Sequence, residues 1–410
     1  MGGKIIPLNI VMTYPVYWNK FGVFRDFIQN FYDSVDCHEW SKKFHYTYNE
    51  DKLCMYVDDV TFNYEWLVHI GASTKTNSDG NSAGYFGEGF KIASLCAFRD
   101  FHMDITMSSG DWKLNVTKIH QSIDDKDIEM LAYNLMAKEF SNSSCLELSP
   151  VTENDFQVFE DTMNSFYYPE NPLIGETIFE GKNASVYLCN TDNYNFGMPY
   201  TYDFQRKGAV FCANQLRGSN PFGLVVCLNK YKQKDRERNT LYDFEVTKVL
   251  GDAFSYISAD ASVVVLEKMR TVWNSVPKKH IDLKSWGPVV KMLIYNISDS
   301  ENARKMFVDK YPNLLYLPPT NCGYDEIRRK FAMEWLKNQD GKYKAVQVSF
   351  RNLGYPSLEQ KCEEEGGFID YDLPGRVEND CMQILEEIVQ KIYKGFFDID
   401  ESMPTRKIIN

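Results

Sequence analysis

Three glycines, Gly84, Gly87 and Gly89, lie within six positions of the chain, and an apolar stretch of helical spacing follows them. Glycine adopts positive φ without a Cβ clash, so such a segment can fold back and direct successive backbone N–H groups at one point. A helix that begins directly behind the segment adds the positive end of its dipole. The segment therefore predicts a phosphate site, with a plain tight turn as the alternative. Its residues are Gly84, Tyr85, Phe86, Gly87, Glu88, Gly89, Phe90 and Lys91.

A second set of polar residues lies in a stretch whose apolar residues, from Phe21 to Phe31, recur at helical spacing. Asp26, Asn30 and Asp33 follow one another at intervals of four and three residues, so they share one stripe of the predicted helix. Carboxylate and carboxamide oxygens one turn apart suit a hard cation such as Mg²⁺, or can orient a water molecule. The simpler alternative is a solvated helix face.

Two short β-like stretches come next, Phe44–Tyr48 and Leu53–Val57, and the second is followed by Asp58. An acidic residue at the end of a strand can accept a hydrogen bond from an exocyclic amine such as that of adenine. Residues 76–83 are Asn, Ser, Asp, Gly, Thr and Ala, a composition typical of a mobile loop. Because this loop leads into the glycines, we expect it to act as a lid.

In this order the segments resemble those of the GHKL ATPase superfamily, which includes gyrase B subunits, MutL proteins, ninety-kilodalton heat-shock chaperones, MORC proteins and histidine kinases. The resemblance implies ATP and Mg²⁺ as cofactors in a Bergerat-type two-layer α/β sandwich. Asn30 matches the magnesium-binding asparagine, and Asp58 matches the adenine-binding aspartate. Asp26 lies where relatives carry the glutamate that activates water. The other matching positions are Asp33, Gly71, Ser73, Lys75, the residues Gly84 to Lys91, and Ser144 in a closing strand.

The sequence departs from the family pattern in two places. The family's Asp-x-Gly-x-Gly reads Asp58-Asp59-Val60-Thr61-Phe62 here, so both glycines are replaced. Asp26 is one methylene shorter than glutamate, and a misplacement of roughly 1 Å can cost on the order of a hundredfold in rate. We therefore expect slow hydrolysis of ATP, or binding with very little turnover.

Residues 151–280 read as a helix, several strands and two long helices, which resembles the β-rich transducer domain that follows the ATPase domain in relatives. In those relatives a basic residue of the transducer reaches the γ-phosphate. The dense basic stretch Lys230–Asn239 contains Arg236 and Arg238, which are our candidates for this role, because a guanidinium is a good bidentate phosphate ligand. Gln205 and Gln215 are weaker candidates. A solvated loop is the alternative.

Residues 281–410 alternate strand-like and helix-like stretches, beginning with a predicted strand at Val289–Ile294. This pattern predicts a small α/β domain with a βαβ unit and a parallel sheet. Asp370 and Asp372 have the Asp-x-Asp spacing of some magnesium sites, but two acids at that spacing are common by chance. No function is predicted for this domain.

The chain has 410 residues and a net charge of −12, and 44% of the residues are hydrophobic. This size and composition predict an α/β protein with three domains, 1–150, 151–280 and 281–410. The acidic balance argues against broad nucleic-acid or membrane binding, although the one basic stretch could touch nucleic acid. No apolar stretch approaches the roughly 18 residues of a membrane span. The ten cysteines contain no Cys-x-x-Cys pair, so we expect reduced thiols in a cytoplasmic protein and neither zinc nor disulfides.

Two functions are compatible with these patterns. The first is an ATP-driven switch that couples Mg²⁺–ATP binding and slow hydrolysis to lid closure, with self-association or a protein partner engaged as a result. Asp26 would then be the general base. The second is a nucleotide-gated binding module or sensor that barely hydrolyses and serves a separate effector. A histidine kinase is less favoured, because no phospho-acceptor helix stands beside the predicted ATP domain.

Overall fold

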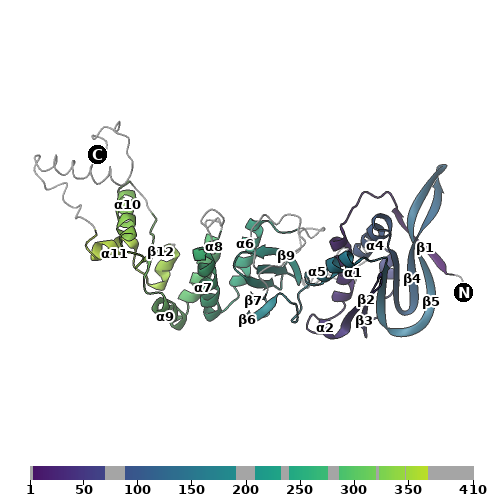
Figure 1. Cartoon of the computed structure of the whole chain (residues 1–410), viewed down its shortest axis with the longest axis horizontal. Helices are drawn as coiled ribbons and strands as arrows, with labels where there is room; N and C mark the ends of the chain where they lie inside the picture. Colours follow the sequence, from purple (N-terminus) through teal and green to yellow (C-terminus); the bar gives the residue numbers. More distant parts are fainter. Residues whose placement is uncertain are drawn as a thin grey trace, which may run out of the picture. The chain divides into compact units, whose positions relative to one another are not determined.

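The computed structural model describes residues 3–69, 88–190, 208–231, 240–275, 286–319, 323–346 and 348–367. The chain divides into two compact units, Met1–Asn296 and Ile297–Asn410 (Figure 1). The mixed α/β class expected from the sequence is confirmed. The residues expected to form separate domains at 1–150 and 151–280 lie together in the first unit.

A five-stranded sheet organises the first part of this unit. Its strands are β1 (Lys4–Val11), β5 (Lys126–Ser149), β3 (Lys52–Asp58) and β2 (Phe44–Asn49) in that order, with β4 (Asp104–Ile123) paired to β5. All of these pairings are antiparallel. The strand β4 is 20 residues long. Together with β5 it forms a hairpin that closes at the pair Ile123 and Lys126.

Helices cover one face of this sheet and give the two-layer arrangement that the sequence predicted (Figure 1). They are α1 (Lys20–Tyr32), α4 (Gly89–Asp100) and α5 (Glu153–Met163), with the short helices α2 (Trp40–Lys43) and α3 (Glu65–Val68) nearby. Along β3, alternate residues Leu53, Met55 and Val57 are fully buried in the same apolar cluster as the α1 phenylalanines. The period of two in the strand and the spacing in the helix therefore direct both apolar faces into one core.

Side-chain caps fix where α1 and α5 begin. Asn19 caps α1 by accepting a hydrogen bond from the Gly22 N–H (2.9 Å). Thr152 and Asp155 form a reciprocal capping box at the start of α5. Lys20 makes an ion pair with the buried Asp155, which joins the first turns of the two helices. The polar residues at these helix starts therefore satisfy backbone donors and also hold the helices together.

A second five-stranded sheet forms the rest of the first unit. Its order is β6 (Ile174–Glu180), β7 (Ala184–Cys189), β10 (Leu224–Leu228), β8 (Gly208–Cys212) and β9 (Gln215–Asn220). β10 runs parallel to β8, and the other pairings are antiparallel. The helices α6 (Asp243–Phe254) and α7 (Ala259–Ser275) follow. Both β8 and β10 are buried along their whole length, which explains their continuous apolar sequences.

The prediction of a strand at Val289–Ile294 is wrong, because these residues belong to the helix α8 (Gly287–Ser298). The β-branched composition suggested a strand. The buried residues recur with a helical period, however, so they lie on one side of the helix. They are Val289, Val290, Leu293, Ile294 and Ile297.

The second unit contains the predicted parallel βαβ arrangement. β11 (Leu314–Tyr316) and β12 (Lys344–Val346) pair in parallel, and α10 (Gly323–Lys337) connects them. The other elements are α9 (Glu301–Lys310), the 3₁₀ helix η1 (Val348–Leu353) and α11 (Leu358–Glu364). The Asp370 and Asp372 pair lies outside the described residues.

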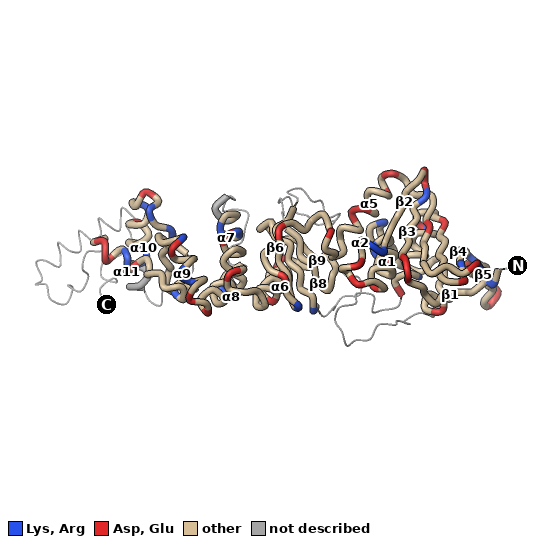
Figure 2. The backbone as a smooth tube through the Cα atoms, turned by 90° about the horizontal axis from the view of Figure 1, so that it is seen from below, with Lys and Arg blue, Asp and Glu red and all other residues tan. Residues whose placement is uncertain are grey.

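Positive and negative residues are mixed over the described parts of the chain. Figure 2 shows Lys and Arg interspersed with Asp and Glu along the described parts of each unit. Among the helices that the structure describes, none has both the length and the apolar character needed to cross a bilayer.

Candidate functional site

The helix α1 meets the start of α4 at one close contact between Asp26 and Gly89. The Asp26 side chain is buried, with 3% exposure, and its Oδ1 lies 2.4 Å from the place where a Cβ would be built on Gly89. Only glycine permits such an approach to the backbone. The acidic residue of the predicted stripe is thus held at the N-terminus of the helix that follows the glycine-rich segment.

Two residues of α1 contact Asp26, one at its carboxylate and one at its backbone. Arg25 contacts the second oxygen, Asp26 Oδ2, through Nη2 (3.1 Å) and Nε (3.3 Å). Asn30 donates from Nδ2 to the backbone carbonyl of Asp26 (2.6 Å). The side-chain oxygen of Asn30 is not used in this hydrogen bond. Asp33 is the C-cap residue of α1 and is half-buried. The acid therefore lies at the start of α4, the amide bonds back onto the α1 backbone, and Asp33 lies at the C-terminal end of the helix.

The first turn of α4 carries a buried lysine. Lys91 is 1% exposed, and its Nζ lies 3.5 Å from the backbone carbonyl of Trp66. Burial lowers the pKa of Lys91 to about 8, and the nearby Glu88 carboxylate offsets part of that effect. Phe90 points into the core, where its ring packs 5.4 Å from that of Phe27. Lys91 therefore places a buried amino group next to the N-terminus of α4.

Asp58 does not lie with these residues. Its neighbour Val57 is buried in the core beneath the helices, and strand alternation turns Asp58 to the opposite face of the sheet. There the Asp58 carboxylate is exposed and lies 3.3 Å from His45 Nε2. This placement does not support the prediction that Asp58 binds adenine beside α1.

Ser144 faces the helix side and holds the segment that follows β3. Its hydroxyl donates to the carbonyl of Val60 (2.8 Å) and lies 2.7 Å from Ser109 Oγ. Ser109 Oγ in turn accepts from the N–H of Phe62 (2.6 Å), and the Phe62 ring packs 6.1 Å from that of Phe31. Phe62 stands where the family pattern has its second glycine, so an aromatic ring fills space that glycine would leave open.

One contact that the sequence did not predict connects α1 to the second sheet. Gln215, the first residue of β9, donates from its side-chain amide to Gln29 Oε1, and both side chains are buried. Tyr32, at the end of α1, donates its hydroxyl to the carbonyl of Tyr167. Gln215 had been a weaker candidate for contacting phosphate, but here it contacts the helix that carries Asn30. Arg25 and Gln29 carry no local sequence signal, because their roles depend on tertiary contacts.

Several predicted site residues lie outside the described residues, and the structure does not place them. They are Gly71, Ser73, Lys75, Gly84, Tyr85, Phe86, Gly87, Gln205, Arg236 and Arg238, together with the predicted lid at 76–83.

Comparison with protein-family models and with curated protein sequences finds no match for this chain.

Proposed function

We propose that the first unit binds Mg²⁺–ATP between α1 and the N-terminus of α4 and acts as a nucleotide-dependent conformational switch. The observation that carries the proposal is the contact of Asp26 with Gly89, which holds the acid of this stripe beside a helix N-terminus. Backbone N–H groups at a helix N-terminus attract phosphate, and an amide oxygen such as that of Asn30 suits Mg²⁺. The buried Lys91 adds a cationic group in the same turn.

The environment of Asp26 favours slow hydrolysis. A general base must accept a proton from the attacking water, and here Arg25 contacts one carboxylate oxygen while the other faces Gly89. One of these contacts must loosen before Asp26 can act on water. This observation supports the second candidate function, a nucleotide-gated binding module with little turnover that serves a separate effector.

Recognition through phosphate and metal would dominate over recognition of the base. Asp58 pairs with His45 on the other face of the sheet, and Phe62 packs under α1 where relatives have glycine. We therefore expect the protein to discriminate only weakly between ATP and GTP. Contact with the γ-phosphate by Arg236 or Arg238 remains a sequence-based proposal.

A signal from the nucleotide would pass through α1. The Gln29–Gln215 hydrogen bond and the Tyr32–Tyr167 hydrogen bond join this helix to the second sheet. A shift of α1 on nucleotide binding would therefore strain buried contacts in the middle of the unit. We propose that this is how nucleotide occupancy controls self-association or engagement of a protein partner.

The binding step is tested by calorimetry of the full chain with a non-hydrolysable ATP analogue and Mg²⁺. The Asn30→Ala variant is expected to lose at least about tenfold in affinity, which corresponds to about 1.4 kcal/mol. Asn302→Ala, on an exposed position of α9 in the other unit, is the matched control and should bind as the wild type does. Absence of binding heat at millimolar nucleotide, with an unchanged Asn30→Ala variant, would refute the proposal.

Phosphate release distinguishes the two candidate functions. If the protein is an ATPase, Asp26→Ala removes most of the turnover and retains binding of the analogue. If it is a sensor, the wild type already shows turnover close to the buffer rate, and nucleotide changes its oligomer size or its retention of a partner.

A further inference from the structure

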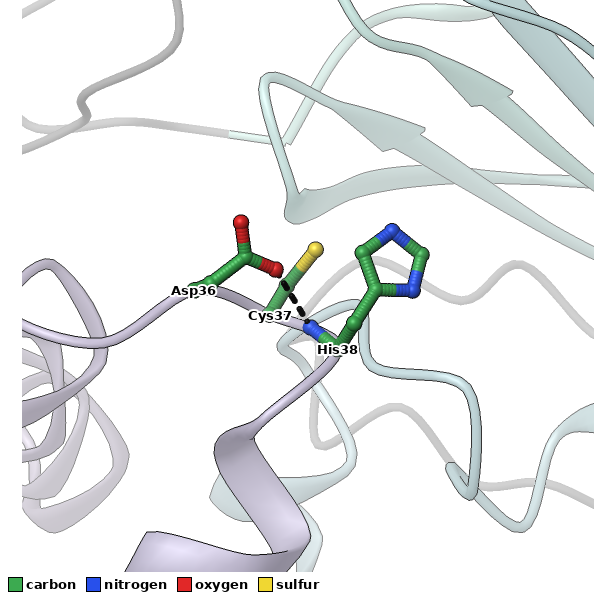
Figure 3. Close-up of side chains that lie close together, drawn as sticks. All are labelled: Asp36, Cys37 and His38. Carbon is green, nitrogen blue, oxygen red and sulfur yellow. Dashed lines mark hydrogen bonds between the residues drawn. The ribbon is translucent and has the colours of Figure 1, made fainter.

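The loop between α1 and α2 gathers three different metal-binding side chains. Asp36 Oδ1 accepts a hydrogen bond from the N–H of His38 (2.8 Å), and the Asp36 carbonyl accepts one from the N–H of Glu39 (2.9 Å). Side chains of successive residues point to opposite sides in an extended chain, but this turn brings three of them to one side (Figure 3). The carboxylate, the Cys37 sulfur and an imidazole nitrogen lie within 4.8 Å of one another.

We propose that Asp36, Cys37 and His38 bind a zinc(II) ion, with the fourth coordination position facing a cleft in the first unit. Sulfur, imidazole nitrogen and carboxylate oxygen are the ligands that zinc takes in proteins, at about 2.0–2.3 Å from the ion. Ligand atoms of a tetrahedral zinc site are accordingly about 3.5 Å apart. Atoms that already lie within 4.8 Å need only small side-chain rotations to reach that spacing.

The cleft supplies the open side of the site. It has a volume of about 310 Å³, and Cys37 and His38 line one side of it. Glu180 and Lys182 at the end of β6 and in the following turn line another part, together with Asn214 and Asn229. Three protein ligands and one open position are typical of zinc sites that bind water or a further ligand. The acid and the lysine are suited to hold a zinc-bound water or a small anion there.

A buried hydrogen-bond network holds the loop and the opposite wall in position. Tyr32, just before the loop, donates to the carbonyl of Tyr167. The hydroxyl of Tyr167 lies 2.7 Å from that of Tyr187, which donates to Glu180 (3.4 Å). Support of this kind outside the ligands themselves is what keeps a metal site in shape. The network ties the end of α1, directly before the loop, to the strands β6 and β7.

Cys37 is a half-buried free cysteine. Zinc binds a cysteine as the thiolate, so zinc binding releases the thiol proton to the solvent. The absence of a Cys-x-x-Cys pair predicted that the protein has no zinc site, because zinc sites are ordinarily found by that spacing and three adjacent ligands lack it. The other titratable groups around the thiol are Tyr32, His38, Tyr167, Glu180, Lys182 and Cys227.

The test uses the full chain, stripped of metal with a chelator and titrated with Co²⁺ and then Zn²⁺. Co²⁺ bound through a thiolate gives a near-ultraviolet charge-transfer band, so the wild type should develop this band at one equivalent and lose it when zinc replaces cobalt. Cys37→Ser should abolish the band. His38→Gln should lower zinc affinity at least about 100-fold, because even partners outside the ligand set are worth 10–100-fold.

Matched controls separate this site from unspecific binding. Cys54→Ser removes a half-buried thiol on β3, and His120→Ala removes an exposed histidine that contacts Asp127. Both should bind cobalt as the wild type does, and circular dichroism checks that all variants fold. A band that persists in Cys37→Ser, or no binding at one equivalent in the folded wild type, overturns the proposal. No nucleotide is present, so failure here leaves the proposed nucleotide site untouched.

Discussion

The carboxylate of Asp26 lies so close to Gly89 that a Cβ at this glycine would come within 2.4 Å of its Oδ1. The Asp26 side chain on α1 therefore fits against α4 only because residue 89 has no side chain. The contact sets both the distance of Asp26 from α4 and the direction in which its carboxylate points, and it can be tested directly.

Gly89→Ala should push Asp26 away from α4 and lower both stability and nucleotide affinity. Overpacking of a buried contact costs about 1–3 kcal/mol, because the neighbouring groups must move. Gly251→Ala in α6 is the control, since nothing lies within 4 Å of an added Cβ there. That change should be neutral or stabilise by up to about 1 kcal/mol. Urea unfolding of both variants measures the difference, and equal stabilities would contradict the assigned contact.

Lys91→Met should stabilise the protein near neutral pH. The pKa of Lys91 is lowered by burial to about 8 from 10.5, so the unfolded chain binds more protons between these two values. Stability from this group therefore rises as pH increases from about 8 to 10.5, and below that range the fold carries a buried charge. The variant removes a cost on the order of 2 kcal/mol.

The pH dependence of unfolding provides the check. The stability advantage of Lys91→Met should be largest at pH 7 and shrink toward pH 10. Lys118→Met, at a half-exposed lysine paired with Glu129, serves as the control and should show no such trend. A constant difference across this range would mean that Lys91 does not titrate as its burial requires.

Asp58→Asn should leave nucleotide affinity close to that of the wild type. The Asp58 carboxylate faces away from α1 and lies near His45, so its neutralisation alters only an exposed contact on the other face of the sheet. Calorimetry with the ATP analogue measures the effect, and Asn30→Ala provides the contrasting loss. A loss of ATP affinity larger than tenfold would show that Asp58 contacts the adenine base.

Asp155→Asn should destabilise the first unit at neutral pH and matter little in acid. Burial alone would raise the pKa of Asp155, but hydrogen bonds from Lys20 and Thr152 outweigh it and hold the pKa below its usual value. The stabilisation is present above the unfolded pKa of about 3.9 and is lost as pH falls through the lower folded value. A loss of about 1–3 kcal/mol is expected at pH 7.

Thermal unfolding at pH 7 and at pH 3 tests this prediction. Glu153→Gln, at an exposed position in the same first turn, is the control and should change stability little. If Asp155→Asn is as stable as the wild type at pH 7, the ion pair with Lys20 does not hold α1 and α5 together.

Local patterns predicted the layers of the first unit well. The helical spacing of Phe24, Phe27 and Phe31 placed α1, and alternation at Leu53, Met55 and Val57 placed β3, because each pattern depends on one element and one core. The polar strand β9 was missed, since its residues Gln215–Asn220 are buried through contacts with distant segments rather than through apolar composition.

The site was harder to predict than the layers. The end of β3 was placed correctly at Asp58, but the face on which Asp58 lies follows from its register opposite Ser143 on the distant strand β5. The contact between Gln29 and Gln215 joins residues 186 positions apart, and no local pattern reports it. Close approach of Asp26 to Gly89 likewise depends on how two helices pack.

The helix α1 connects the two sites proposed for this protein. From Asp26 to Tyr32 it advances about 9 Å, and the loop with Cys37 begins just beyond its end. The proposed nucleotide site lies near the middle of this helix, and the loop of the proposed zinc site follows its C-terminal end. Whatever factor zinc imposes on nucleotide affinity, nucleotide must impose on zinc affinity. A zinc-selective chelator that leaves Mg²⁺ in place would then change nucleotide affinity without any change to the amino-acid sequence.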